Sequence, residues 1–180
     1  NFGTPATGKA RLNLKATLFS PFTLMDSVTI GALHSQGSGS TETSTYGYLA
    51  YEMPLWNLSN YLSLFVGNNL FDIGGDFQTL ELEGSANVGM IEYRYKWGDG
   101  LSRQHLSIAA HTISTDYQST FDTPSLEPDE DEYGGRISWQ VIAQSGSGHS
   151  LFSSRLGYTG GEYSSNQFAD DRQFGKFEMT

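Results

Sequence analysis

The sequence of 180 residues predicts an all-β protein, namely about nine strands of an antiparallel transmembrane β-barrel. First, 21 Gly and 13% aromatic residues beside only 37% hydrophobic residues are typical of a chain rich in turns and strands. Second, polar and apolar residues alternate along segments long enough to cross a bilayer when tilted. Third, short and long connections follow one another in turn, as they do in outer-membrane barrels.

Nine segments read as strands, at about 9–19, 27–36, 45–54, 59–71, 80–97, 103–118, 134–145, 150–159 and 173–180. All but the last reach the roughly 9 to 11 residues of a tilted membrane strand, whereas strands of soluble sandwiches have about 5 or 6. Short connections are expected at 20–26, 54–59, 97–103 and 145–150. Longer, more polar ones are expected around 37–44, 72–79, 119–133 and 160–172.

Alternation is clearest in three of these segments. In the first, the polar residues Lys9, Arg11, Asn13, Lys15 and Thr17 alternate with Ala10, Leu12, Leu14, Ala16 and Leu18. The fifth segment ends with Ile91, Tyr93, Tyr95 and Trp97 against Glu92, Arg94 and Lys96, and the seventh sets Ile137, Trp139 and Val141 against Arg136, Ser138 and Gln140. Aromatic residues close to a turn are typical of the girdle at a membrane interface.

The cationic residues predict a wet interior. Eight of the ten Lys and Arg residues fall on the polar face of a strand, and we expect them to line the lumen: Lys9, Arg11, Lys15, Arg94, Lys96, Arg136, Arg155 and Lys176. Most acidic residues lie in or near the long connections instead. A Lys or Arg facing lipid costs about 2 to 4 kcal/mol at the midplane, so such strands need a hydrated face. A soluble barrel or sandwich with that face toward water is the alternative interpretation.

Composition also excludes several classes of protein. The net charge of -10 argues against nucleic acid as a partner, because phosphate binding needs a basic surface. The absence of Cys excludes a disulfide framework and a thiolate metal site. No run of 18 apolar residues occurs, so no transmembrane helix is expected.

Motifs for catalysis or cofactor binding are missing from the sequence. There is no HExxH, P-loop, GxGxxG or GxSxG. His105, Ser107 and His111 share one face of a strand, which leaves a barrel hydrolase as an alternative. In the acidic run, Asp129, Asp131 and Gly134 fit calcium-loop positions 1, 3 and 6, but Tyr133 occupies position 5 and Gln140 occupies position 12, where a bidentate Glu is needed. We therefore expect no catalytic residue, no metal site and no cofactor.

The order of motifs resembles the barrel of TpsB transporters of two-partner secretion, which belong to the POTRA-barrel superfamily related to BamA. The opening NFGTPATG looks like that family's first outer loop, DNxGxxxTG, through Asn1, Gly3, Thr7 and Gly8. The stretch SPFTLMD looks like its turn NPLGLGD through Pro21, Leu24 and Asp26, and YEMP looks like its YSxP motif through Tyr51 and Pro54. The late stretch from Phe152 is similar to the family's late strand, long loop and following strand.

This resemblance implies a bacterial outer-membrane pore that translocates an unfolded partner protein without ATP, a cofactor or a catalytic residue. Expected partners are the secreted polypeptide, outer-membrane lipid, lipopolysaccharide and other envelope subunits. Residues 1–180 would form part of one barrel domain, and the POTRA domains and C-terminal barrel strands would lie outside them. An outer-membrane barrel hydrolase and a soluble carbohydrate-binding β-sandwich remain as alternative functions.

Overall fold

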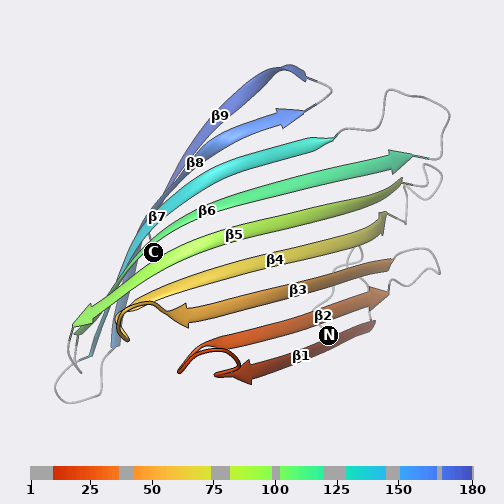
Figure 1. Ribbon diagram of the computed structural model, residues 1–180. Coiled ribbons are helices and arrows are strands. Elements are labelled where there is room, and N and C mark those ends of the chain that lie inside the picture. The colour runs from red at the N-terminus through yellow and green to blue at the C-terminus, as the bar shows by residue number, and fades with distance from the viewer. Residues whose placement is uncertain are drawn as a thin grey trace.

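The computed structural model describes residues 10–36, 43–73, 82–98, 102–119, 129–144, 151–165 and 168–179. They contain nine strands: β1 (Ala10–Phe19), β2 (Ser27–Gln36), β3 (Thr43–Pro54), β4 (Asn60–Ile73), β5 (Leu82–Gly98), β6 (Ser102–Ser119), β7 (Glu130–Gln144), β8 (Leu151–Ser165) and β9 (Phe168–Met179). The strands form one sheet in chain order, and each is antiparallel to the next (Figure 1). The predicted all-β, antiparallel class is confirmed.

Two of the expected long connections are shorter in the structure than predicted. The loop expected at 160–172 is mostly strand, because β8 continues to Ser165 and β9 begins at Phe168. The loop expected at 119–133 also ends early, because β7 begins at Glu130. Glu162 and Asp131 therefore lie in strands. The alternation signal fails at these strand ends because both faces there carry polar residues, so a period of two is absent.

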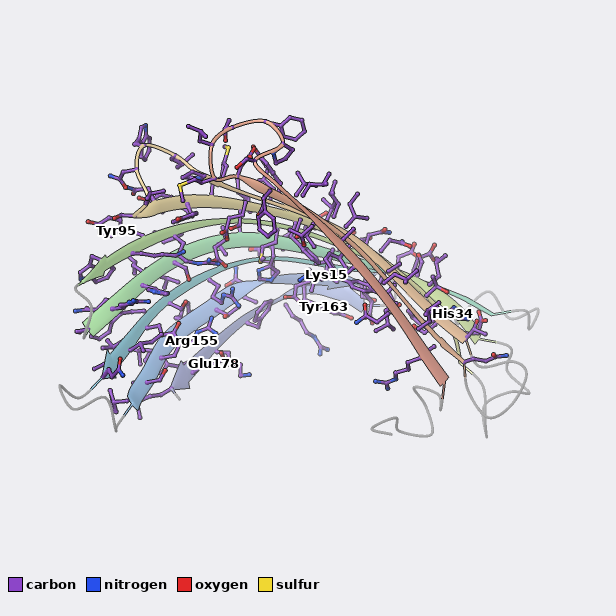
Figure 2. The ribbon with its side chains drawn as sticks, turned by 90° about the horizontal axis from the view of Figure 1, so that it is seen from below. Lys15, His34, Tyr95, Arg155, Tyr163 and Glu178 are labelled. Carbon is purple, nitrogen blue, oxygen red and sulfur yellow. The ribbon has the colours of Figure 1, made fainter. Side chains whose placement is uncertain are left out.

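The sheet is curved, and its nine described strands do not close into a barrel by themselves. β1 and β9 lie at opposite edges and each has one neighbour among the described strands (Figure 1). Seen from below, the strands form an arch with a hollow side (Figure 2). Lys15, Arg155 and Glu178 lie on that hollow side, whereas Tyr95 lies on the outer side. The two faces of the sheet are called the hollow face and the outer face below.

Two neighbouring rows across the sheet show how different these faces are. On the outer face, directly paired residues of β4 to β9 form the outer row: Leu62, Tyr93, Ile108, Ile137, Tyr158 and Phe177. One residue along each strand, the hollow row consists of Ser63, Glu92, Ala109, Arg136, Thr159 and Lys176. Side chains alternate across a strand, so the chain separates an aliphatic and aromatic surface from a polar one with a period of two.

The apolar surface of the outer face is exposed rather than packed into a core. Within the described residues, Ala109 is the one hydrophobic residue that is buried. In the outer row, Ile108 and Ile137 are 50% and 47% exposed, and Phe177 is 66% exposed. A water-soluble domain of this length would bury most of such surface. The sheet itself therefore leaves the apolar side chains of the outer face uncovered.

The apolar surface ends before the strands do. On β5 the outer face carries only glycine, aliphatic and aromatic residues from Gly89 to Trp97. Toward the end of the sheet that holds the β4–β5 connection, called the loop end, it becomes polar. There Asn68 donates to Asn87 at 2.8 Å and Gln173 donates to Glu162 at 3.1 Å. A band of this length, about nine residues, matches the hydrocarbon core crossed by a tilted strand.

At the opposite end, called the turn end, three outer-face aromatic side chains donate hydrogen bonds to residues beside the connections. The Tyr51 hydroxyl donates to Asp26 Oδ2 at 2.8 Å, and Trp139 Nε1 donates to Gln104 Oε1 at 3.2 Å. The Tyr93 hydroxyl donates in the same way to Asn60 Oδ1. In each case the donor lies on the strand that follows the connected pair. Aromatic rings with one polar atom directed toward the turns are typical of a membrane-interface belt.

Candidate functional site

A polar hollow of about 400 Å³ lies on the hollow face near the turn end. Its lining residues come from β5 to β8: Glu92, Arg94, Lys96, His105, Ser107, Arg136, Ser138, Gln140 and Arg155. Cross-strand pairing explains the cluster, because Lys96, His105, Gln140 and Arg155 occupy one continuous row. Four side chains in this lining are cationic and a single one is a carboxylate, so the hollow attracts anions.

The carboxylate of Glu92 organises the floor of this hollow. Its side chain is 7% exposed, and its Oε1 accepts from Arg94 Nη2 at 2.7 Å and from Arg94 Nε at 3.0 Å. Its Oε2 accepts from Arg136 Nη2 at 3.3 Å. A buried carboxylate is costly unless it is paired and hydrogen-bonded, and two guanidinium groups meet that requirement here.

Ala109 makes the contact between Arg136 and Glu92 possible. It lies on β6 directly between Glu92 on β5 and Arg136 on β7. Because its methyl group is short, the Arg136 side chain passes over β6 and reaches the Glu92 carboxylate. On the other side, Arg94 Nη1 lies 3.4 Å from Glu52 Oε2, which extends the network to β3. The ion pairs thus connect three strands, β3, β5 and β7, on one face.

Two other cations in the hollow are not neutralised in this way. Among the residues described, neither Lys96 nor Arg155 forms a salt bridge. The Lys96 ammonium instead lies 3.8 Å from the centroid of the Tyr61 ring, a cation–π contact. Lys96 and Arg155 are therefore the side chains in this hollow whose charge is available to an anionic group that enters it.

Further along the hollow face the surface becomes apolar. A second hollow of about 320 Å³ is lined by Phe65, Val88, Met90, Ala109, His111, Ile113, Arg136 and Thr159. Next to it, the rings of Tyr46, Tyr48 and Phe65 stack in sequence at centroid separations of 5.7 and 5.8 Å. Gly31 makes room for this stack, because a Cβ there would lie 2.1 Å from the Tyr48 ring. The hollow face therefore offers cationic and aromatic contacts side by side.

The residues predicted to line a lumen fall on one face. By register, Arg11, Lys15, Arg94, Lys96, Arg136, Arg155 and Lys176 all belong to the hollow face. The eighth, Lys9, lies outside the described residues. The structure gathers Arg94, Lys96, Arg136 and Arg155 into the polar hollow. Arg11 and Lys15 lie on β1 at one edge of the sheet, and Lys176 lies on β9, where its ammonium is 2.8 Å from Glu178.

The candidate hydrolase residues make other contacts. Ser107 shares a hydrogen bond of 2.7 Å with Ser138, and His111 Nε2 lies 2.9 Å from Glu132 Oε1. Within the described part of the chain, no hydrogen bond joins His105 to Ser107. Asp129, considered as a calcium ligand, precedes β7, and Asp131 lies within it. The described residues contain no group of three His, Asp or Glu side chains placed to hold a metal ion.

Sequence reasoning placed Glu92 on the polar face but gave it no role. Glu92 and Arg94 are two residues apart on one strand, and this spacing puts both side chains on the same face. The contact with Arg136, which is 44 positions away, depends on the register of β5, β6 and β7. A period of two does not predict that register.

Comparisons with known proteins add no relative. No protein-family model matches the chain, and neither a curated protein nor a solved structure matches it. Across the described residues, the structure contains no helix with the length and hydropathy needed to cross a membrane.

Proposed function

We propose that this sheet is one wall of a bacterial outer-membrane β-barrel through which an unfolded partner polypeptide crosses the membrane. The observation that supports it most directly is the contrast between the outer row and the hollow row. Six paired outer positions are aliphatic or aromatic, and the positions next to them hold Glu92, Arg136 and Lys176. A sheet with lipid on one side and water on the other satisfies both rows.

The open edges fit a larger barrel. In hydrocarbon every backbone N–H and C=O group needs a partner, so β1 and β9 would each pair with a further strand. The polar hollow lies on the concave side of the sheet and would face the interior of such a barrel (Figure 2). Lipid would then cover the outer face, and the turn end and loop end would lie in the two aqueous compartments.

The hollow face supports transport of a polypeptide rather than chemistry on a substrate. Lys96 and Arg155 offer exchangeable contacts to carboxylates and backbone carbonyls, and the stack of Tyr46, Tyr48 and Phe65 offers contacts to apolar side chains. An unfolded chain presents both kinds of group. The resemblance of the turn around Asp26 and of the YEMP stretch to TpsB transporters supports protein secretion as the function of the pore.

A planar-bilayer experiment with the full chain tests this proposal. We expect conducting channels that prefer anions, and the double variant Lys96→Gln/Arg155→Gln should lower that preference. Asp116→Asn, which changes one charge on the outer face, is the matched control and should leave it unchanged. A protein that stays monodisperse in water without detergent and never conducts would exclude the barrel.

The secretion step has a test of its own. An unstructured acidic polypeptide added to one side should cause transient current blockades, and they should become shorter in the Lys96→Gln/Arg155→Gln variant. A folded protein of the same charge should cause none. Stable conductance without blockades by the unfolded polypeptide would leave a membrane pore but would refute polypeptide transport.

A further inference from the structure

The two connections that the structure describes at the turn end carry an unusual set of exposed apolar side chains. In the connection 20–26, Phe22, Leu24 and Met25 are 77%, 85% and 59% exposed. In the connection 55–59, Trp56 and Leu58 are 81% and 56% exposed. Turns in water are normally built from polar residues, Gly and Pro. Five large apolar side chains on two adjacent turns therefore need an explanation.

Neither connection presents a charge. Residues 20–25 and 55–59 contain no Asp, Glu, Lys or Arg. The one acidic residue, Asp26, is 1% exposed, with its Oδ2 bonded to Tyr51 and to the backbone N–H of Thr23. The loop end differs, since the sequence 127–132 alone contains five acidic residues. The two ends of the sheet thus differ in charge as well as in hydrophobicity.

Both connections fold toward the outer face. In Figure 2 the segments between β1 and β2 and between β3 and β4 curve away from the hollow side of the arch. The Phe22 ring meets the outer-face Tyr51 ring edge to face, with centroids 6.0 Å apart. Beside the second connection, the buried Asn60 at the start of β4 accepts from Tyr93 and donates to Asn57 Oδ1 at 2.7 Å. These contacts hold each connection against the edge of the apolar band.

The backbone of the first connection is held in a bent conformation. Ser20 and Met25 have positive φ angles of 55° and 69°, which cost about 1 to 2 kcal/mol each for residues other than Gly. Ser20 N–H donates to the Asp26 carbonyl at 2.7 Å, and Met25 N–H donates to Ser20 Oγ at 3.1 Å. The hydrogen bonds oppose this cost and fix the side of the sheet on which Leu24 and Met25 lie.

We propose that these two connections are membrane-interface anchors whose apolar side chains insert among the lipids of the leaflet at the turn end. The inference rests on the proposed membrane location and extends it to segments outside the strands. Turns that expose no charge and continue the apolar band, with buried polar groups and exposed Phe, Leu, Met and Trp, have the composition of interfacial segments. Insertion would fix the depth and tilt of the sheet at this end.

Site-specific fluorophores test the proposal, because the 180 residues contain no Cys. In the full chain, Leu24→Cys probes the first anchor, Leu64→Cys probes the outer band, and Ser153→Cys probes the hollow face near the turn end. Each variant is labelled with an environment-sensitive dye and reconstituted into phosphatidylcholine vesicles that contain brominated lipids. We expect several-fold stronger quenching at Leu24→Cys and Leu64→Cys than at Ser153→Cys, with bromine near the headgroups favouring Leu24→Cys.

The outcomes separate the two proposals. Quenching at Leu64→Cys without quenching at Leu24→Cys would refute the anchors and leave the membrane barrel intact, as expected if a soluble partner protein covered the turns. No quenching at either position would refute both. Adding Tyr51→Phe to Leu24→Cys should reduce quenching at the anchor but not at Leu64→Cys. Unchanged quenching in that variant would show that the Asp26–Tyr51 contact does not orient the turn.

Discussion

Tyr51 on β3 donates its hydroxyl hydrogen to Oδ2 of Asp26 at 2.8 Å, across 25 positions of sequence. Asp26 ends the first connection and Tyr51 lies near the end of β3, so the bond joins that connection to the strand that follows β2. The backbone N–H groups of Phe22 and Thr23 donate to the same oxygen at 3.3 and 3.0 Å. The first connection and the end of β3, which are separate in the sequence, are thus held together by the Asp26 carboxylate.

We predict that Tyr51→Phe and Asp26→Asn destabilise the protein through this one contact. Each single variant should lower the urea midpoint, because Tyr51→Phe removes the donor and Asp26→Asn removes the negative charge that strengthens the same bond. The double variant should lower the midpoint by less than the sum of the two. Tyr95→Phe is the matched control, since the Tyr95 hydroxyl forms no hydrogen bond with any described residue. Additive effects of the two substitutions would mean that the hydroxyl and the carboxylate act independently.

The protonation of Asp26 gives a dependence on pH. Burial alone would raise the pKa of Asp26, but hydrogen bonds from Tyr51 and from the backbone of Thr23 and Phe22 hold it below its ordinary value of 3.8. A lowered pKa in the folded state means that the ionised group stabilises the fold above that ordinary value and stops doing so as the pH falls through the lower value. We expect the difference in unfolding midpoint between the native protein and Asp26→Asn to be constant at neutral pH and to shrink below about pH 4. A difference that persists to pH 2 would contradict this assignment.

Glu92→Gln should weaken the network on the hollow face. The carboxylate is 7% exposed, but Arg94 and Arg136 are 29% and 34% exposed, so solvent moderates the loss. We expect a fall of about 1 to 3 kcal/mol in the free energy of unfolding, below the 3 to 5 kcal/mol typical of fully buried pairs. Urea denaturation of the reconstituted full chain measures it. Glu178→Gln, which removes an exposed partner of Lys176, is the control and should change stability by less than about 1 kcal/mol.

Much of the fold was predictable because the two faces of the sheet carry different kinds of residue. The alternation of polar and apolar residues from Arg136 to Gln140 predicted a strand and the two faces of that strand. The register confirms this, because Arg136, Ser138 and Gln140 lie on the hollow face and Ile137 and Trp139 lie on the outer face. At Glu162 this signal disappears, because the strand there extends past the apolar band. For that reason the sequence predicted a loop where β8 continues.

The contacts that organise the hollow were not predictable in the same way. Arg136 reaches Glu92 only because β5, β6 and β7 pair in a register that places Ala109 between them. The Tyr93–Asn60 bond likewise depends on β5 lying beside β4. Closure is a further step that alternation does not determine, since an open curved sheet and a closed barrel have the same period of two.

Ala109 provides the sharpest test of the hollow face, because its neighbour in sequence faces the other way. Ala109→Leu adds bulk at a residue that is 5% exposed and blocks the path of the Arg136 side chain to Glu92. We expect a loss of about 1 to 3 kcal/mol in stability from overpacking. Ala110→Leu adds the same bulk to the exposed outer face, paired with Ile91, and should be tolerated in a lipid bilayer.

Urea denaturation of both variants in vesicles compares their stabilities, and a second comparison in the Arg136→Met background tests the mechanism. If Ala109→Leu acts by displacing Arg136, part of its effect should disappear once Arg136 is gone. Equal destabilisation by Ala109→Leu and Ala110→Leu would mean instead that the two faces do not differ in the way this sheet requires.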